Sequence, residues 1–496
     1  MVYDIIFVTG EAFFDSPLCG AAILKRLLEK HNLSVGIIEM PRKEADVAKL
    51  GKPRLFFGVS AGSIDSLVRN YTPLKKLREE DKNLSYDKQV PDRAVIVYSN
   101  WVRHLFPDAV IVLGGTEASL RRFVHYDYWQ NRLRKPVLFD SRADILAYGS
   151  AEKQVLEIAG RIRAGEPLLG IAGTCVVGRT PAGLQLPSFD EVSRSKESFC
   201  DMQNMLTNEA DLCQKIDNRY AVQFRSPQYT TADLDSYYEL PFSRKAGKRL
   251  SGFEFSVVTH RGCIGNCSFC SLTLTQGRRI VSRSEGSIIR EIRTISGMPH
   301  FRGVIDDLGG PAANMYGMDC NLCNKSCLDC RKLDRSNRRV IELLKKARAI
   351  KGVKNVFIRS GIRYDLVSDE YLGELTRHVS GRLKIAPEHV NRNVLKLMNK
   401  DFGNLKNFMR KFKKTGKELS FYFMTAHPGS GMKEAKELAD AIRSLKNAEA
   451  VQVFTPTPMT VSTCMYYTGL DPSTKEKVYV PYTYREKKEQ KRLVTG

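Results

Sequence analysis

The sequence predicts an α/β protein in which a Rossmann-like parallel sheet is followed by an open, partial (β/α)6 barrel. Short apolar runs rich in Val and Ile alternate with amphipathic segments twice along the chain, first over 1–185 and again over 249–470. The length of 496 residues also exceeds what one ordinary core supports, so we expect more than one domain.

The N-terminal domain, residues 1–185, is expected to form a parallel sheet with helices such as 21–30 and 152–164 on its faces. The expected strands are 3–8, 33–39, 55–59, 94–98, 109–113 and 145–148. Ligands of such sheets bind at the carboxyl ends of the strands. Turn sequences fall at those ends, at Gly10-Glu11, 15–20, 60–62 and 114–117. They indicate either a ligand edge or ordinary turns.

Residues 186–248 lose this alternation, so we interpret them as a partly ordered connector. The second series follows, with strands expected at 253–259, 303–308, 355–359, 382–386, 419–425 and 451–455. Helical stripes such as Ile288, Ile292 and Ile295 lie between them. β/α barrels build their active sites at the C-terminal ends of the strands. Residues 471–496 are polar and basic and are interpreted as a C-terminal arm.

The charge balance is strongly basic, with 78 Lys and Arg against 55 Asp and Glu and a formal net charge of +23. This balance suits a polyanionic partner such as RNA, although a basic surface that aids solubility gives the same count. No apolar run approaches the roughly 20 residues needed to span a bilayer, and the first residues do not resemble a signal peptide. We therefore expect a cytoplasmic protein without a membrane partner.

Seven of the twelve cysteines fall between 263 and 330, which favours metal binding over disulfides. Three of them, Cys263, Cys267 and Cys270, lie in one loop after an expected strand, in a C-x3-C-x2-C pattern. Three thiolates leave one iron of a cubane cluster open to chelate the amino and carboxylate groups of a methionine moiety. Structural zinc sites use four ligands, and His260 would have to supply the fourth. An iron–sulfur cluster is favoured.

This spacing, with Phe269 before the last cysteine, resembles the signature of radical S-adenosylmethionine (SAM) enzymes. The stretches SVVTHRGC, GVIDDLGGPAANMY, SGIRYDL, LKIAPEHV and QVFTPTPM are similar to the YgiQ-type radical SAM family, as are N-terminal stretches such as VLGGTEASLRRFVHYDYW. The resemblance implies a [4Fe-4S] cluster that reductively cleaves SAM to a 5′-deoxyadenosyl radical acting on an unknown substrate. It also implies an electron donor of the flavodoxin or ferredoxin type.

The same resemblance assigns candidate SAM contacts. Gly309 and Gly310 stand where such enzymes carry a Gly-Gly-Glu motif for the methionine amino group, but Pro311 replaces the acid. Backbone carbonyls are therefore expected to bind that amino group. Ribose and carboxylate contacts are expected at the ends of the third and fourth strands, from Ser360, Arg363, Glu388 and His389. Each of these four residues could equally form a salt bridge or a helix cap.

A second cysteine group, Cys320, Cys323, Cys327 and Cys330, forms an insertion in the barrel. Four thiols within eleven residues strongly indicate a metal. The compact spacing favours an auxiliary iron–sulfur cluster, and zinc is the alternative.

The N-terminal domain resembles the cobalamin-binding domains of some radical enzymes, whose D-x-H-x-x-G loop supplies an axial histidine. Residues 15–20 keep the Asp and the Gly but contain no histidine, so bound cobalamin is not expected, although it could bind without a protein ligand. The alternative is a Rossmann-like domain that shapes substrate access. His125 lies in an aromatic run that is interpreted as ordinary packing rather than a stacking surface.

Three functions follow. The first is a radical SAM enzyme. Its segment from Gly277 to Arg283 resembles methylthiolating RNA-modifying enzymes, which makes RNA a candidate substrate. The second is an iron–sulfur binding or sensing protein whose cluster is not catalytic. The third is a basic nucleic-acid-binding scaffold held together by zinc.

Overall fold

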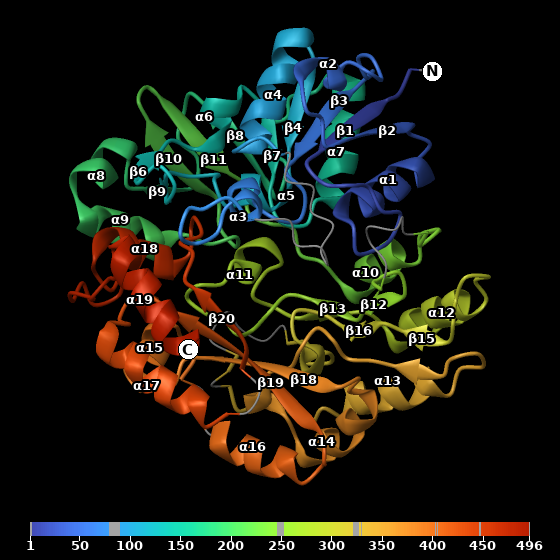
Figure 1. The fold of residues 1–496 in the computed structure, drawn as a ribbon. Helices are drawn as coiled ribbons and strands as arrows, with labels where there is room; N and C mark the ends of the chain where they lie inside the picture. Colours follow the sequence, from blue (N-terminus) through green and yellow to red (C-terminus); the bar gives the residue numbers. More distant parts are fainter. Residues whose placement is uncertain are drawn as a thin grey trace. The chain divides into compact units, whose positions relative to one another are not determined.

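The computed structural model describes residues 2–78, 90–245, 252–320, 327–328, 330–401, 403, 405–445 and 448–495 (Figure 1). The chain forms two compact units. The N-terminal unit comprises Met1–Gln228, Leu240–Ser243 and Thr455–Val478, and the barrel unit comprises Tyr229–Glu239, Arg244–Phe454 and Tyr479–Gly496. In the described part of the chain, no helix has both the length and the apolar composition needed to cross a bilayer.

The N-terminal unit contains a nine-stranded sheet in the order β2-β1-β3-β4-β7-β8-β11-β10-β9. Its first five strands are parallel and confirm five of the six expected strands: β1 Ile5–Thr9, β2 Val35–Glu39, β3 Phe56–Ser60, β4 Val110–Leu113 and β7 Ile145–Ala147. Their order, 2-1-3-4-5, is that of the flavodoxin-like doubly wound sheet, which places the topological switch point between β1 and β3.

The strand expected at 94–98 is wrong, because this segment begins helix α4, Ala94–Leu105. A short apolar run bounded by polar residues fits a buried strand and a buried helix equally well. The buried positions Ala94, Val95, Tyr98, Ser99 and Val102 recur with helical rather than alternating spacing. The run thus continues into a helix that covers the sheet.

Alternate residues of the parallel strands enter two separate apolar cores. Ile5 and Phe56 face the core that contains residues of α1 Gly20–Lys30 and α7 Glu152–Ala164. Ile6 and Phe57 face the core built with α4. Helices therefore cover both faces, as the alternation predicted. The short helices of this part are α2 Glu44–Val47, α3 Ser66–Asn70, α5 Gly115–Ser119 and α6 Val137–Ser141, and the β5–β6 hairpin joins His125–Asp127 to Arg132–Arg134.

The connector expected at 186–248 requires correction, because much of it extends the N-terminal sheet. Strands β10 Leu212–Ile216 and β11 Arg219–Gln223 form an antiparallel pair, and β11 joins β8 Thr174–Gly178. The sequence signal was the two-residue Asp-Asn turn between Ile216 and Arg219. The remaining elements here are β9 Leu184–Leu186, α8 Phe189–Arg194, α9 Lys196–Met205 and α10 Thr231–Tyr238, of which α10 belongs to the barrel unit.

The barrel unit contains the six expected strand positions in chain order. They are β12 Ser256–Val258, β15 Val304–Ile305 with β16 Asp307–Gly309, β17 Asn355–Val356, β18 Arg382–Glu388, β19 Glu418–Thr425 and β20 Ala448–Val453. The pairings β12–β16, β15–β17, β18–β19 and β19–β20 are all parallel. This arrangement matches an open barrel, whose active site is expected at the carboxyl ends of the strands.

Amphipathic helices surround these strands and bury their apolar stripes in one core. Ile288, Ile292 and Ile295 of α12, Glu285–Ser296, enter this core as predicted. The other helices and turns are α11 Leu272–Thr275, η2 Ala313–Met315, α13 Arg338–Arg348, η3 Tyr364–Leu366, α14 Asp369–Leu375, η4 Thr376–His378, α15 Arg392–Leu397, α16 Leu405–Lys413 and α17 Met432–Arg443.

The C-terminal arm expected at 471–496 also requires correction. Its helix α19, Tyr484–Thr495, packs into the barrel unit through Val494 and Gln490. The fully buried Gln490 side chain accepts hydrogen bonds from Thr425 Oγ1 and Ala426 N, both at 2.9 Å, and donates to Ser430 O at 2.8 Å. The basic composition of this segment gave no indication that Val494 and Gln490 point into the core. Helix α18, Val461–Thr468, belongs to the N-terminal unit.

Candidate functional site

The loop that carries the three predicted cluster cysteines, residues 262–280, leaves the first barrel strand position. Two short antiparallel strands, β13 His260–Arg261 and β14 Val281–Ser282, close its base. Gly262 has a φ of +87°, and a Cβ there would collide with the carbonyl of Arg279. Only glycine satisfies both conditions, so Gly262 determines the direction in which the loop leaves the strand. We call this segment the cluster loop.

The three thiols of the cluster loop, those of Cys263, Cys267 and Cys270, are half-buried. The Cys270 amide donates to Cys267 O at 3.0 Å, and the Gly265 amide points to Cys263 Sγ at 3.4 Å. Burial raises the pKa of Cys267 and raises that of Cys270 to about 12, which favours the protonated thiols. A bound metal reverses this preference, because a coordinating thiol is deprotonated outright.

Gly265 lies directly beside two of these sulfurs. A Cβ at Gly265 would lie 2.6 Å from Arg363 Nη1, 3.4 Å from Cys263 Sγ and 3.7 Å from Cys267 Sγ. The structure therefore brings Arg363 to the cluster loop. Two hydrogen bonds to Asp365, of 3.0 and 2.7 Å, orient its guanidinium.

The donor set fits an iron–sulfur cluster. Among the described residues, no three His, Cys, Asp or Glu side chains converge as ligands of a single metal ion. A cubane does not require that convergence, because each thiolate binds a different iron atom. Three thiols in one loop, two of them beside Gly265 and the Arg363 guanidinium, meet its requirement for soft ligands and leave one iron without a protein ligand.

The Gly309-Gly310 segment at the end of β16 lies against two other candidate residues. A Cβ at Gly309 would collide with Ser360 Oγ, and one at Gly310 would lie 2.6 Å from Cε1 of His260. Gly309 O already accepts hydrogen bonds from Thr259 N at 2.8 Å and from Thr259 Oγ1 at 3.1 Å. A carbonyl has two lone pairs, so Gly309 O has no capacity left for the methionine amino group.

Ser360 donates through its amide and its hydroxyl to Asp307 Oδ1, at 3.1 and 3.3 Å. The amide of Arg359 donates to the same oxygen at 2.7 Å. Asp307 thus ties the ends of the second and third strand positions together. The Ser360 hydroxyl keeps its acceptor lone pairs for another group.

Glu388 ends β18 with a φ of +68°, a left-handed conformation that is costly for a residue with a side chain. Pro387 cannot donate to the ladder, and the strand register shifts between Ile385 and Glu388. The Glu388 carboxylate pairs with Lys400 Nζ at 3.0 Å. Lys400 in turn lies 5.6 Å from the ring centroid of Phe269 in the cluster loop.

His389 is almost completely buried and has a defined tautomer. The Asn391 amide donates to His389 Nδ1 at 3.0 Å, so the ring proton resides on Nε2. Burial lowers the pKa of His389 to about 4, which keeps the ring neutral. Within the described residues, Nε2 has no hydrogen-bond partner. His389 therefore presents a buried donor that awaits an acceptor.

Two further buried histidines lie near this site. His427 contacts Phe269 edge-on, with 6.3 Å between ring centroids, and its Nδ1 donates to Pro428 O. His260 Nδ1 bonds Thr259 Oγ1 at 2.9 Å, and its Nε2 has no partner among the described residues. Burial lowers the pKa of His427 to about 3 and that of His260 to about 4.

Sequence reasoning missed His427 and Lys400 as site residues, and it considered His260 only as a zinc ligand. No local sequence pattern connected Lys400 with the site, because Lys400 lies 130 residues after Cys270 in the chain. His427 follows the fifth strand directly, and that position could have drawn attention to it.

Of the second cysteine group, the structure describes Cys320, Cys327 and Cys330, and Cys323 lies outside the described residues. Cys327 and Cys330 pack against an apolar cluster that includes Ile264 and Met315, and Cys263 packs against the same cluster. The second group thus lies beside the cluster loop within the barrel unit.

The carboxyl edge of the N-terminal sheet is occupied by protein groups. Glu11 accepts hydrogen bonds from Ser63 N and Ser63 Oγ at 2.9 and 2.8 Å. Asp15, which opens the loop compared with cobalamin-binding domains, pairs with Arg26 and accepts from the Ser243 amide at 2.9 Å. His125 and its neighbour Tyr126 are buried, as ordinary packing predicts.

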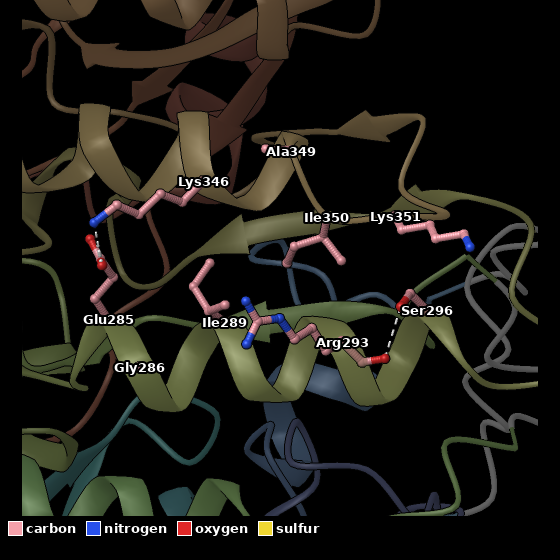
Figure 2. Close-up of a pocket in the computed structure, with 9 residues that line it drawn as sticks. All are labelled: Glu285, Gly286, Ile289, Arg293, Ser296, Lys346, Ala349, Ile350 and Lys351. Carbon is pink, nitrogen blue, oxygen red and sulfur yellow. Dashed lines mark hydrogen bonds and ion pairs between the residues drawn. The ribbon is translucent and has the colours of Figure 1, made fainter.

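Figure 2 shows a groove of about 610 Å³ between α12 and α13, away from the strand ends. Its lining is Glu285, Gly286, Ile289, Arg293, Ser296, Lys346, Ala349, Ile350 and Lys351. None of the predicted cluster or SAM residues lines it. We assign the groove no role in the site.

Three known protein families match successive parts of the chain. Residues 2–255 match the Radical SAM N-terminal family, residues 257–442 match the Radical SAM superfamily, and residues 449–495 match a domain of unknown function. The superfamily match contains the cluster loop and all six candidate SAM contacts. Membership in this superfamily implies a [4Fe-4S] cluster and SAM as cofactors.

Among curated proteins, a UPF0313 protein from Methanocaldococcus jannaschii is 46% identical over 537 residues, covering 99% of this chain and 89% of that protein. A UPF0313 protein from Thermotoga maritima is 42% identical over 542 residues, covering 99% and 95%. These relatives extend over the N-terminal and barrel units together.

Among solved structures, the radical SAM methyltransferase TsrM from Kitasatospora setae gives a TM-score of 0.57 at 13% identity, covering 93% of this chain and 76% of that one. The cobalamin-dependent SAM radical enzyme OxsB gives 0.53 at 12% identity, covering 93% and 55%. At this identity the likeness shows a shared fold. The chain belongs to the UPF0313 family and is a radical SAM enzyme, as the resemblance to the YgiQ-type proteins predicted.

Proposed function

We propose that Cys263, Cys267 and Cys270 hold a [4Fe-4S] cluster at which SAM is cleaved reductively, and that the resulting radical acts on a substrate still to be identified. The observation that carries this proposal is that Cys263 Sγ, Cys267 Sγ and Arg363 Nη1 all lie close to Gly265. A cluster with one open iron needs thiolate ligands, and the methionine moiety bound to that iron needs a cation for its carboxylate. When bound, the cluster supplies the electron that breaks the sulfonium C–S bond of SAM.

The residues around the loop divide the binding of SAM among them. Arg363, already oriented by Asp365, faces the methionine carboxylate. Thr259 already occupies Gly309 O through two hydrogen bonds. Binding of the methionine amino group, which was expected of the Gly-Gly backbone, is therefore assigned to the Gly310 carbonyl. Ser360 Oγ offers acceptor lone pairs, and His389 Nε2 offers a donor for a ribose oxygen or the carboxylate. Glu388 acts through Lys400 rather than on SAM directly.

For Cys320, Cys323, Cys327 and Cys330 we propose an auxiliary iron–sulfur cluster. Cys327 and Cys330 share an apolar cluster of side chains with Cys263, which favours a role in electron transfer to the first site over a separate structural role. Zinc at this position is the alternative, and metal analysis separates them. Iron alone at a stoichiometry above four per chain supports two clusters.

Cobalamin is not part of the proposal. The TsrM and OxsB structures contain bound cobalamin, but the likeness to them is one of fold. In this chain no histidine lies between Asp15 and Gly20, and Asp15 is engaged by Arg26 and Ser243. Any cobalamin in this unit would lack an axial ligand from that loop.

The substrate class stays open, and RNA is the candidate that the net charge of +23 favours. A flavodoxin- or ferredoxin-type protein is the proposed electron donor. Chemical reductants can replace it in the first assay, so that cluster chemistry is tested without an identified partner.

Anaerobic reconstitution followed by an assay for 5′-deoxyadenosine tests the proposal. We expect the native chain to form 5′-deoxyadenosine with SAM and a strong reductant, and Cys267→Ala to form less than about one hundredth as much. That loss corresponds to roughly 2.7 kcal/mol in the barrier. Cys19→Ser is the matched control, because Cys19 occupies the N-cap position of α1, where serine is favourable.

The outcomes separate the competing functions. Equal yields from the native chain and Cys267→Ala would contradict the site assignment. A cluster that forms but yields no 5′-deoxyadenosine would support the non-catalytic iron–sulfur protein. Zinc without iron after anaerobic purification would support the scaffold instead.

A further inference from the structure

The turn after α15, residues 398–400, is fastened to the cluster loop by two hydrogen bonds. Ser268 N donates to Met398 O, and Asn399 Nδ2 donates to Asn266 O, both at 2.9 Å. Asn399 and Asn266 have φ values of +50° and +44°, which asparagine tolerates better than most residues. The turn therefore has a defined position relative to the loop between Cys263 and Cys270.

Lys400 extends from this turn toward the cluster loop. Its ammonium lies 5.6 Å from the centroid of Phe269, the residue before Cys270, and 3.0 Å from Glu388 Oε1. The Lys400 and Glu388 side chains are only 12% and 13% exposed. Charges sheltered from water interact more strongly and are screened less by salt than charges at the surface.

The Lys400–Glu388 pair is arranged so that the positive charge of Lys400 acts on the cluster loop. Glu388 holds the Lys400 ammonium over the Phe269 ring, whose face attracts a cation. Arg363 also lies at this loop, but its guanidinium pairs with Asp365 through two hydrogen bonds and lies beside Gly265. Lys400 approaches from the turn instead, beside Phe269.

We propose that Lys400 is a positioning residue for electron transfer, whose ammonium stabilises the reduced state of the cluster on Cys263, Cys267 and Cys270. This inference rests on the proposed function. Reduction delivers one electron from the donor protein or a chemical reductant, and it breaks no bond and moves no proton. The electron adds one negative charge, so a nearby cation raises the reduction potential and a nearby carboxylate lowers it. Lys400 and Glu388 thus set the potential together.

An EPR-monitored redox titration of the anaerobically reconstituted full chain tests the inference. The midpoint is read from the signal that changes when SAM is added, which identifies the cluster with the open iron. Lys400→Met keeps the apolar stem and removes the charge. We expect it to disfavour reduction about tenfold, which is about 59 mV toward negative potential for a one-electron couple. Lys400→Arg should match the native chain.

Glu388→Gln provides the opposite change. It leaves the ammonium without its carboxylate, so the midpoint should move toward positive potential. Iron and sulfide are measured in every sample, and Lys400→Gln serves as a second uncharged variant if Lys400→Met takes up less iron than the native chain.

Two results would overturn the inference. One is an unchanged midpoint in both uncharged variants at native iron content. The other is equal loss of iron from Lys400→Arg and the uncharged variants, which would assign Lys400 to holding the loop together. A native chain that takes up no iron fails at an earlier step and contradicts the proposed function itself.

Discussion

The carboxyl edges of the two parallel sheets differ in how their polar groups are satisfied. At the N-terminal edge, the fully buried Glu117 accepts from the amides of Ser66 and Val95 at 2.8 and 3.1 Å. Arg121 pairs with Asp65 through Nη1, while its Nε has no partner among the described residues. At the barrel edge, His389 Nε2 and His260 Nε2 have no partner among the described residues. The three thiols of the cluster loop also lie there, two of them beside Gly265.

The carboxyl ends of the strands therefore serve different purposes in the two sheets. Parallel sheets bind ligands outside their carboxyl ends because the turns there are replaceable without loss of the core. In the N-terminal sheet those turns bind each other, and their charges serve stability. At the barrel edge, two buried histidine nitrogens, His389 Nε2 and His260 Nε2, lack partners among the described residues, at a cost of about 1–3 kcal/mol each. A ligand that bonds them recovers that cost, which favours the barrel edge as the functional one.

The largest expected effect is the loss of Glu117 from the N-terminal edge. Glu117→Ala leaves two buried amides without an acceptor and opens a cavity, so the free energy of unfolding should fall by about 2–5 kcal/mol. Urea denaturation, with hydrogen exchange of peptides that contain β3, measures it. Burial raises the pKa of Glu117, with a further contribution from Asp65, so the comparison is made at pH 8.

Glu11→Ala is the matched control for this change. Glu11 lies at the same edge, but among the described residues its carboxylate bonds Ser63, in a more exposed position, so the expected loss is below about 1 kcal/mol. Equal losses from both variants would contradict the view that the edge is held by its buried charges. A Glu117→Ala chain of native stability would contradict it outright.

The chemistry of the barrel edge was more predictable from sequence than the structure around it. The cluster cysteines, Arg363 and Ser360 were found because short motifs follow strand ends directly. Lys400 and Asn399 were not, since they reach the loop through a turn that no local pattern connects to Cys267. The sequence also could not show that Thr259 occupies the Gly309 carbonyl, which depends on the pairing of β12 with β16.

The fold was predictable where apolar periodicity was clear and failed where it was ambiguous. The five parallel strands of the N-terminal sheet have alternating residues that enter two cores. Residues 94–98 carry an apolar run compatible with either period, and α4 formed because its continuation through Val102 repeats every third or fourth residue. Strands β10 and β11 were missed because polar residues such as Gln214 and Gln223 are buried in them.

A smaller effect is expected from His389 at the barrel edge, on ligand affinity rather than on stability. His389→Asn places an acceptor near the position of Nδ1 for the Asn391 amide but removes the Nε2 donor. SAM affinity of the reconstituted chain should fall about tenfold, which is roughly 1.4 kcal/mol, while the free energy of unfolding without SAM changes by less than about 1 kcal/mol. Calorimetric titration with SAM measures the first quantity.

His389→Gln reverses the design, because its amide nitrogen lies near the position of Nε2 and the acceptor for Asn391 is lost. This variant should keep more SAM affinity than His389→Asn and lose more stability. If both variants bind SAM like the native chain, His389 is not a SAM contact, and the unpartnered donor serves the substrate or packing.

The smallest effect should come from the groove of Figure 2, which lies at neither edge. Lys346 and Glu285 pair across it at 2.6 Å, but their side chains are 53% and 39% exposed. An exposed pair of this kind contributes about 0–1 kcal/mol, because water screens it and two side chains must be ordered. Lys346→Ala should therefore leave unfolding, iron content and 5′-deoxyadenosine formation close to native. A marked loss of 5′-deoxyadenosine in this variant would move function away from the strand ends and contradict the contrast between the two edges.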